Sequence, residues 1–231
     1  MPTPITRAGI REGARFSLPL MPGVLVFGTA FGAAAAQKGM ALAEALGISA
    51  FVFAGAAQMV ALELWREVWT PSTLLGITVV TATINARMIL MGAAIQPWMR
   101  GAPLRFQALT LFLFTDASWM IGTRYQAEGG RDLGVLLGAG IALWVGWVAA
   151  TLPGHLAGSL VTDPKASGLD LILPLFFSFM FVPLWGGLRR AVPWAVAAGV
   201  GLAVQSFVPG YAFIVAGALA GALFAAAWPD D

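Results

Sequence analysis

Residues 81–90 read TATINARMIL, and they place Arg87 in the middle of an apolar run from about Ser72 to Trp98. A run of this length is enough to cross a bilayer as a helix. A guanidinium stays protonated in any protein setting, so it cannot avoid burial by losing its charge. Insertion scales put the cost of an arginine at a helix centre at roughly 2.5–3.5 kcal/mol. The sequence therefore predicts a polar site at mid-membrane, where an acid, water or an anionic ligand offsets this cost.

The composition is that of an integral membrane protein. The chain has 231 residues, of which 59% are hydrophobic and 10% charged, whereas roughly 25% of residues are charged in a soluble domain. We expect one transmembrane domain over residues 1–231 and no separate soluble module. There are no cysteines and one histidine, His155, so the sequence predicts no disulfide, no thiol chemistry, no metal site and no cofactor.

Apolar runs separated by short polar or glycine- and proline-rich turns predict an all-α bundle of seven or eight membrane segments. The basic segment 1–15, with Arg7, Arg11 and Arg15, is expected on the cytoplasmic side. If every segment crosses, however, Arg100 and Arg105 fall on the outer side, against the positive-inside tendency. The runs cover residues 16–36, 42–65, 72–98, 104–121, 133–152, 169–185, 191–208 and 211–228.

The first run contains Pro19, Pro22 and Gly23 within five residues. Proline removes a helix hydrogen bond and clashes with the preceding turn, so this segment is predicted to be broken. The break is either an ordinary kink or a discontinuous helix whose freed amides line a ligand site. The spacings Gly28-xxx-Gly32 and Gly134-xxx-Gly138 indicate close helix packing.

Two polar side chains in the neighbouring runs are candidates to serve the same site as Arg87. Gln58, within the stretch AGAAQ at 54–58, hydrogen-bonds either another helix or a ligand. Asp116 is the one deep carboxylate. Arg87 lies about ten residues before the turn between the third and fourth runs, and Asp116 lies twelve residues after Leu104. In antiparallel helices the two depths differ by roughly 3 Å, so we expect Arg87 and Asp116 to interact.

An ordered set of motifs resembles the AzlC family, the large subunit of branched-chain amino acid exporters. The motifs are RFSLP at 15–19, FGTAFG at 27–32, VFAGAAQ at 52–58, INAR at 84–87, FTD at 114–116 and GLD at 168–170. The resemblance implies export of small apolar amino acids through the cytoplasmic (inner) membrane with a small AzlD-like membrane subunit. The expected partners are the amino acid, the lipid bilayer and that subunit, and no nucleic acid.

The chain departs from the family pattern at two positions close to the expected site. Met88 follows Arg87 where the family has a histidine, and Ala117 follows Asp116 where the family has a glutamate. These changes remove two groups that bind or relay protons. Asn85, Arg87 and Asp116 remain in place.

A transported amino acid is a zwitterion, so its site must satisfy a carboxylate and an ammonium and shelter an apolar side chain. Arg87 is the candidate partner of the carboxylate, helped by amides of the broken first helix. Asp116 is the candidate for the ammonium, or for proton or ion coupling. The residues predicted to bind substrate are Pro22, Gly23, Phe27, Gln58, Asn85, Arg87 and Met88.

Other readings of the same residues stay open. The Arg87–Asp116 pair could serve only to fix helix register, and the chain could be a non-transporting scaffold or assembly subunit. An intramembrane aspartyl peptidase would use Asp116 and Asp170 as a carboxylate pair. A nucleophile pair of His155 and Ser159 would lack an orienting group. A primary pump is not expected, because the sequence has no phosphate-binding G-x-x-x-x-G-K-[ST] loop.

Overall fold

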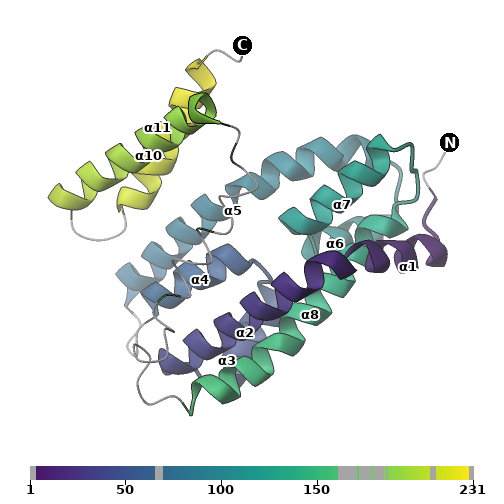
Figure 1. Cartoon of the computed structure of the whole chain (residues 1–231), viewed down its shortest axis with the longest axis horizontal. Helices are drawn as coiled ribbons and strands as arrows, with labels where there is room; N and C mark the ends of the chain where they lie inside the picture. Colours follow the sequence, from purple (N-terminus) through teal and green to yellow (C-terminus); the bar gives the residue numbers. More distant parts are fainter. Residues whose placement is uncertain are drawn as a thin grey trace.

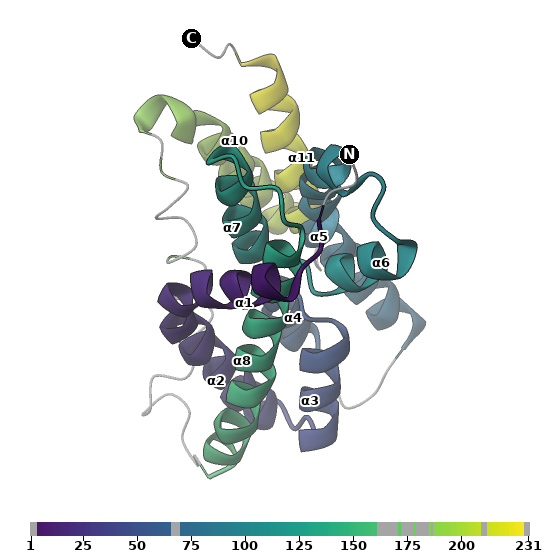
Figure 2. The ribbon, with the colours of Figure 1, turned by 90° about the vertical axis from the view of Figure 1, so that its right-hand side faces the viewer.

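The computed structural model describes residues 4–65, 70–160, 171, 178, 185, 187–208 and 212–228. The elements assigned within these residues are all helices, which confirms the predicted all-α class (Figures 1 and 2). The run at 169–185 lies almost wholly outside the described residues. The helices are α1 (Arg7–Phe16), the 3₁₀ helix η1 (Leu18–Leu20), α2 (Met21–Gln37), α3 (Leu42–Phe51), α4 (Gly55–Leu64), α5 (Pro71–Met99), α6 (Leu104–Phe112), α7 (Asp116–Ala127), α8 (Gly134–Gly158), α10 (Leu188–Phe207) and α11 (Ala212–Ala227).

Three stretches of the described chain are long and apolar enough to cross a bilayer: Arg7–Gln37, Pro71–Met99 and Gly134–Gly158. The first is broken by η1, as its prolines predict, and Figure 2 shows the chain turning between α1 and α2. Pro22 lies in the first turn of α2, where the missing N–H would have had no helical partner. The total number of crossings stays a prediction.

Together α1 and α2 run alongside α8 in the same direction, with their backbones in contact at glycines. A Cβ on Gly138 would lie 1.9 Å from the Ile10 carbonyl oxygen, and one on Gly32 would lie 2.2 Å from that of Thr151. The predicted packing role of both glycine pairs is confirmed. The start of α1 consequently lies beside the start of α8, where the Thr6 N–H donates to Asp132 Oδ1 at 3.1 Å.

The apolar run at 42–65 does not form one continuous helix, because the chain turns back on itself between α3 and α4. The turn lies at Val52–Ala54, where Phe53 has φ 39°. Helix α3 begins close to Lys38, and Lys38 Nζ lies 3.2 Å from Glu63 Oε2 near the end of α4. The two helices therefore form a hairpin that returns to the end of the molecule from which it started.

The apolar run at 104–121 is likewise divided, since α6 and α7 also form a hairpin. Phe106 near the start of α6 belongs to the buried cluster of Trp98 at the end of α5. Tyr125 near the end of α7 has its ring centroid 6.4 Å from that of Trp98. Figure 1 shows α4 beside one end of α5 and α6 and α7 beside the other. The two hairpins thus enter the body from opposite ends.

The hairpin at 104–127 also changes the expected location of two arginines. Ile10 of α1 packs on the same cluster as Trp98, so the end of α5 lies beside the start of α1. Arg100 and Arg105, which follow directly, are therefore at the N-terminal end of the body and not at the opposite end.

Helices α10 and α11 pack on each other, apart from the bundle of α1 to α8 (Figure 1). A Cβ on Gly217 would lie 2.7 Å from the Ala197 carbonyl oxygen, so the two backbones are in close contact. In the described part of the chain, the pair meets the bundle chiefly where α11 touches α5.

Candidate functional site

A cavity of about 220 Å³ lies where the tips of the two hairpins meet, beside α2, α5 and α8. Both tips are turns followed directly by a helix N-terminus, that of α4 and that of α7. Its lining residues are Val24, Phe27, Phe53, Ala54, Gly55, Ala56, Arg87, Met88, Thr115, Asp116, Ala117, Leu143 and Trp147.

Arg87 and Asp116 form an ion pair in the wall of this cavity. Arg87 Nη2 lies 2.9 Å from Asp116 Oδ2, which confirms the interaction expected from their depths. The side chains remain 36% and 45% exposed, so the pair is not buried in the core. Arg87 Nε is buried and has no hydrogen-bond partner among the described residues. The printed ion pair engages Nη2 alone, so the other N–H groups at the end of the guanidinium remain for a further anionic group.

The start of α7 fixes the position of Asp116. Thr115 is the N-cap residue, and its Oγ1 accepts from the Ser118 N–H at 3.3 Å. In return, Ser118 Oγ accepts from the Thr115 N–H at 2.9 Å. This reciprocal capping stabilises a helix start in the interior of the protein. A carboxylate in the first turn, as at Asp116, is also favoured by the helix dipole.

The start of α4 presents open amides to the same cavity. Its first helical hydrogen bond runs from the Gln58 N–H to the Ala54 carbonyl at 2.9 Å. The amides of Gly55, Ala56 and Ala57 precede this bond and have no partner within the helix. Gln58 Oε1 accepts from the Ala54 N–H at 3.2 Å and so caps the turn. Amides at a helix N-terminus are suited to bind an anion.

The remaining wall of the cavity is apolar, and packing and one hydrogen bond hold its residues in place. Phe53, Leu143 and Trp147 are buried, and Trp144 Nε1 donates to the Ala50 carbonyl at 2.9 Å, which satisfies a carbonyl at the end of α3. The positive φ of Phe53 places a bulky residue in the left-handed region, at a cost of about 1–3 kcal/mol. Strain of this kind is typical of ligand sites held by their surroundings.

The structure brings together four of the residues predicted from the sequence, namely Phe27, Arg87, Met88 and Asp116. Gln58 is 1% exposed and caps α4 behind the lining. Asn85 is half-buried on α5 and does not line the cavity.

The break in the first segment does not form this site. Pro22 and Gly23 are exposed in the first turn of α2, outside the cavity lining. The helix starts at the cavity are those of α4 and α7 instead.

Sequence reasoning missed the contribution of Gly55, Ala56 and Thr115. Gly55 and Ala56 offer backbone amides, which leave no side-chain signal. Thr115 did carry one, because threonine followed by an acid and then Ser118 is typical of a helix start.

Other candidate groups lie elsewhere. His155 Nε2 is 2.8 Å from the Met40 carbonyl oxygen, and Ser159 Oγ donates to the Leu156 carbonyl at 2.8 Å, so these two side chains do not form a nucleophile pair. Asp170 lies outside the described residues.

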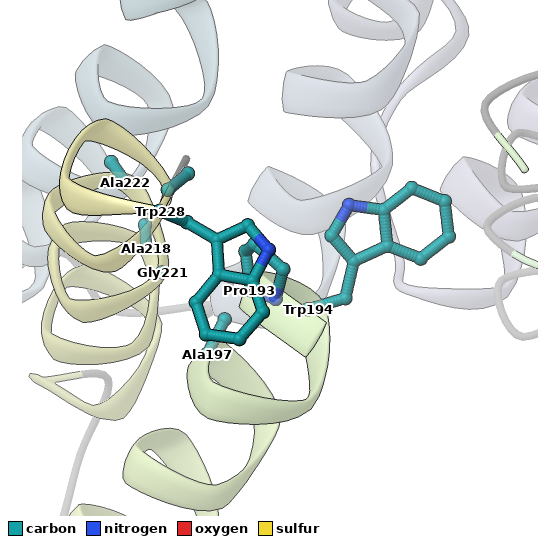
Figure 3. A pocket seen from close by; sticks show the side chains of 8 residues that line it. Pro193, Trp194, Ala197, Ala218, Gly221, Ala222 and Trp228 are labelled. Atoms are coloured by element: carbon teal, nitrogen blue, oxygen red, sulfur yellow. The ribbon is translucent and has the colours of Figure 1, made fainter. Parts of the chain in front are cut away.

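A larger hollow of about 450 Å³ lies between α10 and α11, beside Trp194 and Trp228 (Figure 3). The described residues that line it are tryptophan, proline, alanine and glycine, and none is charged. This hollow therefore offers no charged side chain to the carboxylate or the ammonium group of an amino acid.

Comparison with known proteins places the chain in a family. The AzlC protein family model matches residues 19–161. An uncharacterized membrane protein of Archaeoglobus fulgidus is 30% identical over 219 residues, which cover 94% of this chain and 94% of that protein. The branched-chain amino acid transport protein AzlC of Bacillus subtilis is 24% identical over 216 residues, covering 92% and 82% of the two chains. An uncharacterized membrane protein of Helicobacter pylori is 22% identical over 166 residues, covering 72% and 71%.

No solved structure matches this chain. The family match spans more than half of the sequence and includes both hairpins, α5 and α8. The chain belongs to the AzlC family of membrane proteins.

Proposed function

We propose that this protein is a secondary transporter that exports branched-chain or similar small apolar amino acids across the cytoplasmic membrane. The observation that carries the proposal is a cavity whose wall holds a cation, an anion and open helix amides beside an apolar surface. The name of the Bacillus subtilis relative supports the same substrate class.

Each part of an amino acid has a matching group in this cavity. The carboxylate binds the free donors of Arg87 and the amides of Gly55 and Ala56. The ammonium binds Asp116. The apolar side chain packs against Phe27 and Met88, which lie in the same lining.

The size of the cavity supports a small substrate. Its volume of about 220 Å³ is below the roughly 300–1,000 Å³ of clefts that hold drug-sized ligands. A water molecule takes about 30 Å³ in the liquid. There is room for one small solute and little accompanying water.

Asp116 is also the proposed coupling group. Protonation of its carboxylate removes the negative charge that binds the substrate ammonium and so favours release of the amino acid. Loss of that proton restores the charge that binds the ammonium and, in the absence of substrate, the 2.9 Å ion pair with Arg87. Binding of an ion and release of an amino acid are thereby linked at one side chain.

The N-terminus is proposed to face the cytoplasm, because basic residues gather at the end of the body where α1 starts. The positive-inside tendency then holds without the exception of Arg100 and Arg105. The arginines at this end are Arg7, Arg11, Arg15, Arg100, Arg105, Arg124 and Arg131. A small AzlD-like membrane subunit is the proposed partner, on the strength of the family resemblance.

Transport by purified protein in proteoliposomes tests the proposal. Leucine and valine flux is measured under an imposed pH gradient, with and without a candidate small subunit. We expect Arg87→Ala and Asp116→Asn to lower the flux at least about tenfold, the loss of one charge-assisted contact. Arg100→Ala is the matched control, because it removes the same charge outside the cavity. Unchanged flux in both cavity variants would overturn the assigned roles, and absence of any flux would favour a scaffold subunit.

A further inference from the structure

A second charged pocket lies at the N-terminal end of the body, between the end of α1 and α7. Its volume is about 300 Å³. Arg15, Phe16 and Pro19 line one side, and Arg124, Tyr125 and Glu128 line the other. It shares no lining residue with the cavity at Arg87, so transport of an amino acid does not account for it.

The pocket carries an excess of positive charge. Arg15 is exposed, and none of the ion pairs in the described part of the chain involves it. Arg124 Nε lies 3.0 Å from Glu128 Oε1, which leaves the two Nη groups of that arginine to a further acceptor. The pair is 81% and 63% exposed, so it is weakly held. Two guanidinium groups and one carboxylate thus line the pocket.

Apolar side chains continue directly from this charged pocket. The ring of Phe16 is 43% exposed and lies 6.3 Å from that of Tyr125, measured between centroids. Leu18 and Met120, on the neighbouring turns of the same two segments, are 61% and 50% exposed. A basic pocket next to aromatic and apolar surface is typical of the level of the lipid headgroups.

We propose that this pocket binds the headgroup phosphate of an anionic phospholipid. Guanidinium groups match the oxygens of a phosphate by paired hydrogen bonds, and Arg15 and Arg124 offer them from two helices. The acyl chains lie along Phe16 and Leu18. Arg11 and Arg7 extend the basic stripe of α1 at every fourth residue and favour an anionic over a zwitterionic headgroup.

Lipid retention by the purified full chain tests this assignment. The protein in detergent is titrated with phosphatidylglycerol or phosphatidylcholine, and bound lipid is counted by native mass spectrometry. We expect the unmodified chain to retain phosphatidylglycerol preferentially. The double variant R15Q/R124Q should lose about tenfold or more in apparent affinity, since each arginine loses a charge-assisted contact with the headgroup phosphate.

The matched control is R100Q/R105Q, which removes two exposed arginines at the same end of the body outside the pocket. It should stay within about twofold of the unmodified chain. If R15Q/R124Q does not fold, R15Q alone leaves the Arg124–Glu128 pair intact and should still lose about fivefold, the loss of one charge-assisted contact in the pocket.

Three results would overturn the proposal. Equal losses in the two double variants would mean diffuse attraction to the membrane surface. Equal retention of the two lipids would mean no headgroup selectivity. Displacement of phosphatidylglycerol by millimolar inorganic phosphate would mean a site for the free anion and not for a lipid.

Discussion

The position of the Asp116 carboxylate relative to Arg87 depends on the residues that cap the start of α7. Thr115 caps α7 through its hydroxyl, and Ser118 returns a hydrogen bond to the Thr115 N–H. Removal of a threonine cap typically costs about 0.5–2 kcal/mol. Thr115→Val keeps the shape of the side chain and loses the acceptor, so we expect about 1 kcal/mol less stability in thermal unfolding. Thr115→Ser keeps a hydroxyl acceptor and should lose less than half as much stability as Thr115→Val. An equal loss of stability in the two variants would contradict the capping role.

Gly55 sets how much space the substrate has next to α4. A Cβ at this position would lie 3.0 Å from Cη2 of Trp147 and would reduce the cavity. We expect Gly55→Ala to raise the KM for leucine several-fold more than that for alanine, because the larger side chain needs the lost volume. Gly47→Ala is the control, since a Cβ there meets nothing within 4 Å. A uniform change for both substrates would contradict a role in selectivity.

At the residue scale, the sequence predicted which charged side chains meet in the cavity but did not predict which backbone amides line it. Arg87 and Asp116 were expected to meet because a permanent cation inside an apolar run needs an acid, and counting residues from the turn put them at one depth. The amides of Gly55 and Ala56 could not be predicted in this way. They become available only where α4 begins, and nothing in residues 48–54 (ISAFVFA) interrupts a helix.

In both hairpins the hydrophobic pattern indicates one membrane-length segment, whereas the structure has two shorter helices joined by a turn. The runs at 42–65 and 104–121 are each long enough to cross a bilayer, and length and hydropathy alone do not separate a crossing from two half-length helices. In the first run the turn contains neither proline nor glycine. In the second, the helix-start signal of Thr115 and Ser118 marks the turn.

Labelling of introduced cysteines distinguishes hairpins from crossings, and the chain has no native cysteine to interfere. Lys38→Cys and Glu63→Cys should react on one side of the membrane, because these side chains form an ion pair. Arg100→Cys and Glu128→Cys should react on the other. A membrane-impermeant maleimide applied to intact and permeabilised cells provides the measurement, with the cysteine-free parent as control. If the two runs each crossed the membrane as one helix, positions 38 and 100 would instead react on one side, and positions 63 and 128 on the other.

For the molecule as a whole, the hairpins explain how a chain with few charges holds a polar site between apolar walls. Each hairpin brings a helix N-terminus to the cavity, and α5 brings the arginine between them. The partial positive charge of two helix starts and one guanidinium faces a single carboxylate. This balance favours a ligand that contributes a carboxylate of its own, as a zwitterion does.

Ligand-dependent stability of the purified protein tests this balance without measuring transport. A ligand that binds only the folded state at 100 times its Kd stabilises it by about 2.7 kcal/mol, so leucine should raise the Tm in detergent. Leucinamide lacks the carboxylate and 4-methylpentanoate lacks the ammonium, so each should give a clearly smaller shift. Arg87→Ala should abolish the shift, whereas Arg100→Ala should preserve it. If leucinamide stabilised the protein as much as leucine does, the helix starts and Arg87 would not form a carboxylate site, and the cavity would select its ligand by shape alone.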